Sequence, residues 1–416
     1  MQNIKILLKN NIQYRWLVLL IFVLSQVILS IAGYGWGALA PFLKKMMCLN
    51  NTQIGSISST FYFAAALSAL PSGILVDRYG VKKGLLTWLG LTGVPFLFLA
   101  LFKPAFPVFI ILVGISGLGY GIGNPVCSKG LFIWFDSNIR GRIFGIKQAA
   151  VTIGASLSGV ITVYLARQTG IFNSLGIIGL STAIMIIIAI IYYRDPIQSE
   201  PVFKKTMVYK NRTFLSEFSE LFANKSFLFL SIIMAFLGMA QGVVASFIIL
   251  YANEKLGYSR LESGFVLSLV MLSGAGGRVL WGFISDRLYN ARRKPVIMII
   301  SALAVVTVSL ISIWDVNWYK WLLLLVLIGL GLSTAGWNGI VLTWITEITA
   351  ESTTATSVGL ASTIGWLGFA SGPVAFGSII DYFGFFYAWM TLAFFCIISF
   401  ILCFFLPGVN NGDMQC

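Results

Sequence analysis

The chain has 416 residues, of which 58% are hydrophobic and 10% are charged. Soluble domains carry about 25% charged residues, so this composition excludes a water-soluble globule and makes lipid the expected solvent. The formal net charge is +14, from 28 basic and 14 acidic residues, and the chain has no histidine. We attribute the positive excess to basic loops retained on the cytoplasmic side of a membrane, so it gives no reason to expect a nucleic-acid partner.

Twelve apolar runs follow one another along the chain, six in each half. A helix needs about 20 apolar residues to cross a bilayer, whereas β-barrel strands would be about half that length and alternate in polarity. We therefore predict an all-α polytopic membrane protein with twelve transmembrane helices. The predicted spans are 16–40, 55–76, 84–102, 107–133, 143–166, 171–193, 226–251, 262–284, 295–314, 318–346, 356–380 and 385–406.

The spacing of these runs predicts two six-helix halves, 1–193 and 226–416, joined by a cytoplasmic linker, 194–225. Most lysines and arginines lie before the first span and after the second, fourth, sixth and eighth spans, which predicts that both termini are cytoplasmic. The first run lacks a cleavage site and therefore reads as an anchor in the inner membrane. The linker is interpreted either as an amphipathic surface helix or as a tethering loop. We expect a monomer without a cofactor or a metal.

A short charged hinge separates the second and third spans, and a degenerate copy follows half a chain later. The hinge residues are Gly73, Asp77, Arg78, Gly80 and Lys82 in the first copy and Gly282, Asp286 and Arg287 in the second. Asp77 can pair with Arg140 or Arg142 after the fourth span. One exposed pair is worth about 1 kcal/mol or less, but several together can bias one of two states. The alternative interpretation is a topological stop signal made of basic residues.

The duplicated hinge, the six-plus-six layout and the long central loop resemble the major facilitator superfamily of secondary transporters. This resemblance implies an alternating-access carrier with a central site between its halves and the hinge as a cytoplasmic gate. A channel or a receptor would not need the duplication. An intramembrane enzyme would need a nucleophile, a base or a metal cluster, and the absence of histidine removes the commonest of these.

Two cations lie within the predicted spans. Ionisable residues there cost about 2.5 to 3.5 kcal/mol and usually serve function. At 1.5 Å per residue, Arg278 lies roughly 12 Å above Asp286, and Lys147 lies roughly 7 to 8 Å beyond Arg142. Because no acid lies deep in any predicted span, we expect a transported anion to neutralise these charges. The alternatives are that Lys147 snorkels to the cytoplasmic headgroups and that Arg278 is a gate residue bonded to backbone carbonyls.

A narrower resemblance concerns Arg278 and Tyr120. Arg278 resembles the arginine of the eighth helix in monocarboxylate and oxalate:formate carriers, and Tyr120 resembles an aromatic residue of their cavity. The resemblance implies that Arg278 binds a carboxylate. Oxalate carriers add a lysine in the eleventh helix, which this chain lacks, so Lys147 would have to substitute for it. The phrase around Gly145, Lys147 and Gln148 is closer to cyanate-permease-like and sugar-phosphate-permease-like members.

Further polar and aromatic residues near the middle of the spans are predicted to complete the cavity. These residues are Gln26, Tyr34, Asn124, Gln241, Asn338 and Trp366. Buried amides also bond to neighbouring helices, so packing remains the alternative role for each of them.

The predicted function is secondary active transport of a small organic anion, with a monocarboxylate as the first choice. The alternative is a permease for a cyanate-like or sugar-phosphate-like anion, or for a neutral compound or drug, with Arg278 and Lys147 as gate residues. No carboxylate sits in the middle of a predicted span, which disfavours proton symport through a dedicated acid. A co-transported proton would then travel with the substrate's own carboxylate or through counter-ion exchange at the two cations. Exchange and uniport remain open.

Overall fold

The computed structural model describes residues 12–195, 221, 223–315, 317–349 and 354–406. Within these ranges eleven helical segments are long and apolar enough to cross a membrane, and α3 (Asn51–Tyr79) makes a twelfth when its two pieces count as one span. The pieces meet at 53° next to Pro71, as expected where a proline removes a backbone hydrogen bond. The predicted twelve-helix all-α architecture is confirmed. Most of the predicted linker lies outside the described residues.

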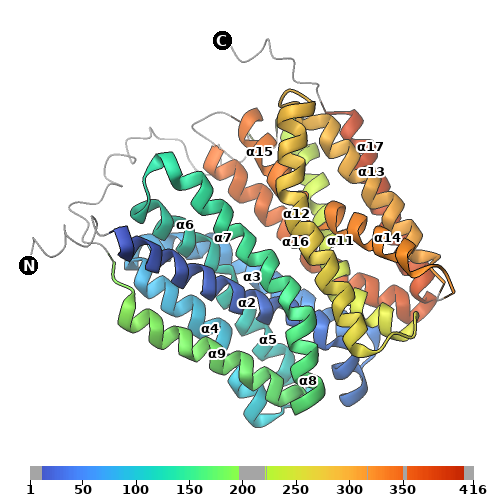
Figure 1. The fold of residues 1–416 in the computed structure, drawn as a ribbon, viewed down its shortest axis with the longest axis horizontal. Coiled ribbons are helices and arrows are strands. Elements are labelled where there is room, and N and C mark those ends of the chain that lie inside the picture. The colour runs from blue at the N-terminus through green and yellow to red at the C-terminus, as the bar shows by residue number, and fades with distance from the viewer. Residues whose placement is uncertain (1–11, 196–220, 222, 316, 350–353, 407–416) are drawn as a thin grey trace, which may run out of the picture.

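The helices form two bundles that lie side by side (Figure 1). The first bundle contains α2 (Ile12–Met46), α3, α4 (Val81–Phe102), α5 (Phe106–Gly121), α6 (Gly123–Trp134), α7 (Ser137–Leu157), the π-helix η1 (Ser158–Thr162), α8 (Val163–Thr169) and α9 (Ile171–Tyr192). The second contains α11 (Lys225–Glu254), α12 (Arg260–Leu288), α13 (Arg293–Ser312), α14 (Lys320–Thr334), α15 (Asn338–Ile348), α16 (Thr354–Phe383) and α17 (Phe385–Phe404).

Two spans are interrupted near their middle. α5 ends at Gly121 and α6 begins at Gly123, while α14 ends at Thr334 and α15 begins at Asn338. Irregular backbone at membrane depth is tolerated where it is buried in protein or lines a cavity. The two interruptions therefore indicate where an internal site lies, one in each bundle.

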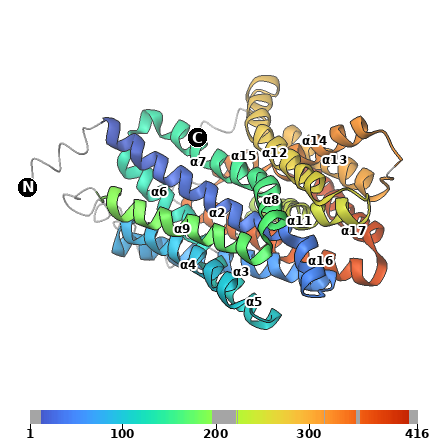
Figure 2. The same cartoon turned by 60° about the horizontal axis from the view of Figure 1, so that its bottom comes forward.

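The bundles touch at the end that carries the loop 47–50, here called the loop end. Lys44 Nζ lies 2.8 Å from Glu254 Oε1 across the two bundles. Asp381 accepts hydrogen bonds from the backbone N–H groups of Asn51 and Thr52, at 2.9 and 2.8 Å, and from both of their side chains, at 2.7 Å. These bonds tie the start of α3 to the end of α16. Figure 2 shows the same pair of bundles from a second direction.

Glycines let the backbones of α3 and α16 approach closely at the loop end. A Cβ at Gly55 would lie 2.1 Å from the carbonyl oxygen of Pro373, and one at Gly377 would lie 2.2 Å from that of Asn51. No side chain fits at such distances, so glycine is required at both positions. The sequence contains both glycines, but the residues that they contact depend on how α3 packs against α16.

The opposite end carries both charged hinges and is here called the hinge end. Asp77 pairs with Lys129 of α6 at 2.9 Å, and the same lysine donates to the carbonyl of Val76. The expected partners are therefore replaced: Arg140 donates to backbone carbonyls of Phe132 and Phe135, and Arg142 is exposed. Lys129 takes their place because α6 runs directly beside the end of α3.

Asp195 joins the first hinge from beyond α9. Its carboxylate accepts from the backbone N–H of Lys82 in the first turn of α4, at 3.0 and 3.1 Å. Negative charge is favoured at this end of a helix. A Cβ at Gly80, whose φ is +90°, would come within 2.8 Å of that carboxylate. Arg78 lies over the ring of Tyr79 rather than in this cluster.

The second hinge is organised around Arg293 at the start of α13. Its guanidinium contacts Asp286 at 2.5 Å and Glu347 of α15 at 2.8 Å. Arg287 instead lies over the ring of Phe283. In each hinge the aspartate therefore pairs with a residue of its own bundle. A Cβ at Gly73 or Gly282 would have open space.

Candidate functional site

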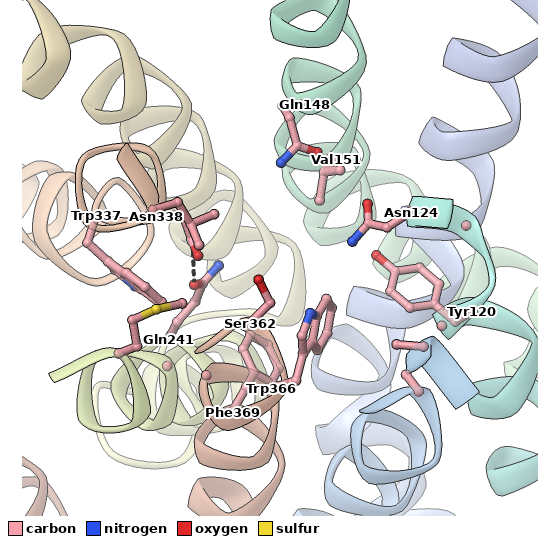
Figure 3. A pocket seen from close by; sticks show the side chains of 18 of the residues that line it. Tyr120, Asn124, Gln148, Val151, Gln241, Trp337, Asn338, Ser362, Trp366 and Phe369 are labelled. Carbon is pink, nitrogen blue, oxygen red and sulfur yellow. Dashed lines mark hydrogen bonds between the residues drawn. The ribbon is translucent and has the colours of Figure 1, made fainter. Parts of the chain in front are cut away.

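A central cavity of about 150 Å³ lies between the bundles, at the level of the two interrupted spans (Figure 3). One water needs roughly 10 to 15 Å³ of such space, so the cavity has room for a small solute. The first bundle contributes lining residues from α2, α3 and the α5–α7 region, and the second from α11, α12, α15 and α16. Eight of the nine predicted binding residues line it: Gln26, Tyr34, Tyr120, Asn124, Gln241, Arg278, Asn338 and Trp366.

Arg278 supplies the positive charge in the cavity wall. It lies on α12, and its Nε donates to the carbonyl of Ala335 at 3.3 Å, where the break before α15 leaves that oxygen accessible. Among the described residues the structure shows no partner for its two terminal amino groups. A guanidinium has five N–H donors in a planar fork. Four of them are therefore available to a ligand in the cavity.

A chain of polar side chains crosses the cavity toward the first bundle. Asn338 Nδ2 donates to Gln241 Oε1 at 3.3 Å, and Gln241 Nε2 donates to Tyr34 Oη at 3.5 Å. Asn338 begins α15, Gln241 lies on α11 and Tyr34 lies on α2. Polar groups from both bundles thus meet at the cavity, and the breaks in the spans bring Asn338 into reach.

Lys147 is the predicted residue that does not line the cavity. Its side chain is 3% exposed, and its ammonium donates to Asn124 Oδ1 at 2.5 Å and to Gln148 Oε1 at 3.2 Å. Asn124 and Gln148 are lining residues. The lysine therefore lies behind the wall and points inward, not toward the membrane surface.

An aromatic cluster closes the cavity toward the loop end. The rings of Tyr62 and Trp366 are stacked with centroids 5.6 Å apart, and Tyr120 meets Trp366 edge-on at 6.2 Å. Phe369 of α16 lies between Tyr62 and Tyr34, with centroid distances of 4.2 and 6.3 Å. Because these rings come from both bundles, they separate the cavity from the tightly packed loop end.

Sequence reasoning missed several lining residues, including Gln148, Ser362, Trp337 and Met234. Ser362 lies four residues before Trp366, so helical spacing could have found it. Trp337 lies in the break between α14 and α15. The apolar run in the sequence continues through this segment and did not predict the break. Met234 has no polar signal, and its place in the wall follows only from helix packing.

Two bundles of membrane-spanning helices around a central polar cavity define a membrane transporter. The profile of the Major Facilitator Superfamily matches residues 22–363. The chain belongs to this family, whose fold is that of transporters rather than enzymes.

Known proteins similar to this chain fit the same family. It is 25% identical over 402 residues to a probable hexose phosphate transport protein of Chlamydia trachomatis, covering 90% of this chain and 86% of the relative. It is 24% identical over 312 residues to a glycerol-3-phosphate transporter of Bacillus subtilis, with 69% of each chain covered. A similar solved structure is a bacterial homologue of the human lysosomal transporter Spinster, inward-facing and unoccupied. Its TM-score is 0.79 at 15% identity, over 95% of this chain and 98% of that one.

Proposed function

We propose that this protein is a secondary transporter that carries a small organic anion across the inner membrane by exposing its central cavity to each side in turn. The observation that carries the proposal is that, in the described part of the chain, the terminal amino groups of Arg278 have no partner in that cavity and the lining residues include no acid. A partly desolvated guanidinium without a protein counter-ion is most stable with an anionic ligand. The anionic group of the substrate would bind there.

The direction of access follows from the charge distribution. We take the hinge end as cytoplasmic, because most of the basic residues lie in the segments at that end. The contacts between the bundles that tie them at the loop end then close the outer side, and the cavity is reached from the cytoplasm. The inward-facing state of the Spinster homologue is consistent with this assignment.

A monocarboxylate is the first candidate substrate. One guanidinium lines the cavity, and a bidentate contact between arginine and a carboxylate satisfies one negative charge in one plane. The charge count of the wall matches a monoanion. Trp366 and Tyr120 would then cover the apolar part of a small acid.

A phosphate ester of a hydroxylated compound is the second candidate. The wall contains the amides of Gln26, Asn124, Gln241 and Asn338, which suit hydroxyl groups better than a bare alkyl chain. Two similar proteins bear the names of hexose phosphate and glycerol-3-phosphate transporters. A phosphate dianion would draw on the charge of Lys147 through Asn124 as well as on Arg278 directly.

Uptake into proteoliposomes tests both candidates, with labelled lactate, formate, oxalate, cyanate, glycerol 3-phosphate and glucose 6-phosphate. Arg278→Ala removes the charge, and we expect uptake of the transported anion to fall by about 30-fold or more, since losing one partner of a desolvated charge pair costs about 2 to 5 kcal/mol. Arg278→Lys keeps the charge but loses the fork, so part of the activity should return. Arg167→Ala, which removes an exposed arginine at the end of α8, is the matched control.

Two outcomes would count against the proposal. Unchanged anion uptake in both Arg278 variants would remove the anion site. Flux that neither saturates nor responds to unlabelled anion on the opposite side would indicate a channel instead of a carrier. Between the candidates, competition of lactate uptake by glycerol 3-phosphate, or the reverse, identifies which anion binds more tightly.

A further inference from the structure

Lys147 is a buried cation that does not line the cavity, so direct contact with a substrate does not explain why a charge is buried there. It is 3% exposed and is absent from the cavity lining, yet it touches two lining side chains from two different helices. Asn124 lies on α6 and Gln148 on α7, and the side-chain oxygen of each accepts a hydrogen bond from the ammonium. The lysine therefore connects two elements of one wall from behind.

The direction of these hydrogen bonds is fixed by chemistry. An ammonium group has three donors and no acceptor, whereas an amide has an oxygen acceptor and an NH₂ donor on opposite sides of its end. Once the oxygens of Asn124 and Gln148 bond to Lys147, their NH₂ groups must point elsewhere. In Figure 3 the nitrogens of both amides lie on the side that faces the second bundle, and both residues line the cavity.

We propose that Lys147 is a positioning residue that sets the polarity of this cavity wall and thereby its preference for anions. By holding both amide oxygens, it presents the NH₂ groups of Asn124 and Gln148 to the substrate as donors. Arg278 presents its amino groups from the second bundle. An anion between the walls receives hydrogen bonds from both sides. The inference rests on the proposed function, because it assumes an anionic substrate.

This arrangement explains how two cations can serve a monoanion. If both cations faced the cavity, a single negative charge could not neutralise them, and the uncompensated one would carry a large desolvation cost. Here two amide oxygens stabilise the ammonium of Lys147. The substrate therefore contacts one guanidinium and several neutral donors. A cation, in contrast, would find the acceptor ends of both amides already occupied. The wall thus selects by polarity without a direct contact from the lysine.

Counterflow in proteoliposomes tests the proposal with labelled lactate and glycerol 3-phosphate, whichever of them the wild type transports. Lys147→Met keeps most of the length of the side chain but removes the ammonium, which frees both amides to rotate. We expect KM to rise by about tenfold or more with the maximal rate little changed, since hydrogen bonds to charged groups are worth about 1.5 to 3 kcal/mol each. Lys147→Arg restores donors to both amides and should recover part of the affinity.

A double-mutant cycle separates positioning from direct binding. In the background Asn124→Ala with Gln148→Ala, the amides are absent, and Lys147→Met should no longer change KM. A KM increase of the same size in that background would mean that the lysine contacts the substrate itself and would overturn the proposal. An unchanged KM for Lys147→Met in the wild-type background would overturn it as well.

Controls protect this test against misfolding and against failure of the proposed function. Lys294→Met removes a lysine that bonds to the backbone carbonyls of Phe404 and Leu406, away from the cavity, and should leave KM unchanged. Where Lys147→Met lowers the thermal midpoint, Lys147→Leu takes its place in the same cycle, because leucine also lacks a donor for the two amides. If Arg278→Ala has no effect on the anion, the proposed function fails. If only Lys147→Met has none, the function stands and the positioning role fails.

Discussion

The two ends of the interface between the bundles are built differently. At the loop end, charges and backbones meet across the bundles: Lys44 reaches Glu254, and Asp381 caps the start of α3. At the hinge end, Asp77 forms an ion pair with Lys129 and Asp286 forms one with Arg293, each within its own bundle. Among the described residues, the ion pair and the close glycine contacts named here that cross between the bundles lie at the loop end.

The difference also bears on how a second state could form. Opening the loop end must break hydrogen bonds and separate carbonyl–glycine contacts, whereas closing the hinge end breaks none of the pairs just named. A two-state equilibrium shifts by the difference in free energy that a change makes between the two states. Variants at the loop end should therefore move the equilibrium toward the state that is open at that end.

The largest shift is expected from Gly377→Ala. Its Cβ would lie 2.2 Å from the Asn51 carbonyl oxygen and 3.0 Å from the backbone nitrogen of Thr52, so α3 and α16 must separate. Overpacking of this kind costs about 1 to 3 kcal/mol, which corresponds to a shift of roughly fivefold to 150-fold toward the state open at the loop end. Distances between spin labels placed at the loop end would measure it.

Gly359→Ala is the matched control for that variant. Gly359 lies on the same helix, α16, and has open space where a Cβ would go. The distances at the loop end should stay as in the wild type. Equal label distances in Gly377→Ala and wild type would show that this contact does not hold the bundles together.

A smaller shift is expected from Asp381→Ala. The variant removes one acceptor group from four donors of Asn51 and Thr52. Because the site is largely open to solvent, water replaces part of the loss, and about 1 kcal/mol remains, or roughly fivefold in population. Labelling of a cysteine introduced at the loop end should accelerate accordingly. Asp381→Asn keeps one acceptor oxygen and should give an intermediate rate, and equal rates in all three proteins would contradict the role given to Asp381.

The sequence alone predicted the helices and eight of the 21 residues that line the cavity, for a physical reason. Lipid forces long apolar runs, so a polar residue such as Gln241 or Asn338 in the middle of a run is a visible exception. The same logic found Arg278. It placed Lys147 correctly on its span but could not tell whether the ammonium faced the cavity, the headgroups or a neighbouring side chain.

What the sequence could not supply were relations between helices. Lys129 lies far from Asp77 along the chain, and its partnership depends on how α6 packs beside α3. The carbonyl partner of Gly377 depends likewise on the approach of α3 to α16. Such contacts leave no local pattern in the sequence. Many other glycines and lysines of the chain stand in similar local sequence and do not make them.

The smallest shift is expected from Lys44→Met. The ion pair with Glu254 crosses the bundles at 2.8 Å, but the two side chains are 24% and 35% exposed, so solvent screens their attraction. Such pairs contribute about 0.2 to 1 kcal/mol, which would move the population by fivefold at most and less at high salt, because ions screen exposed charges. Labelling at the loop end in low and high salt measures both effects, with Lys45→Met as the control on the neighbouring exposed lysine. A shift larger than that of Gly377→Ala would reverse the ranking and would place the main restraint in charge pairing instead of backbone packing.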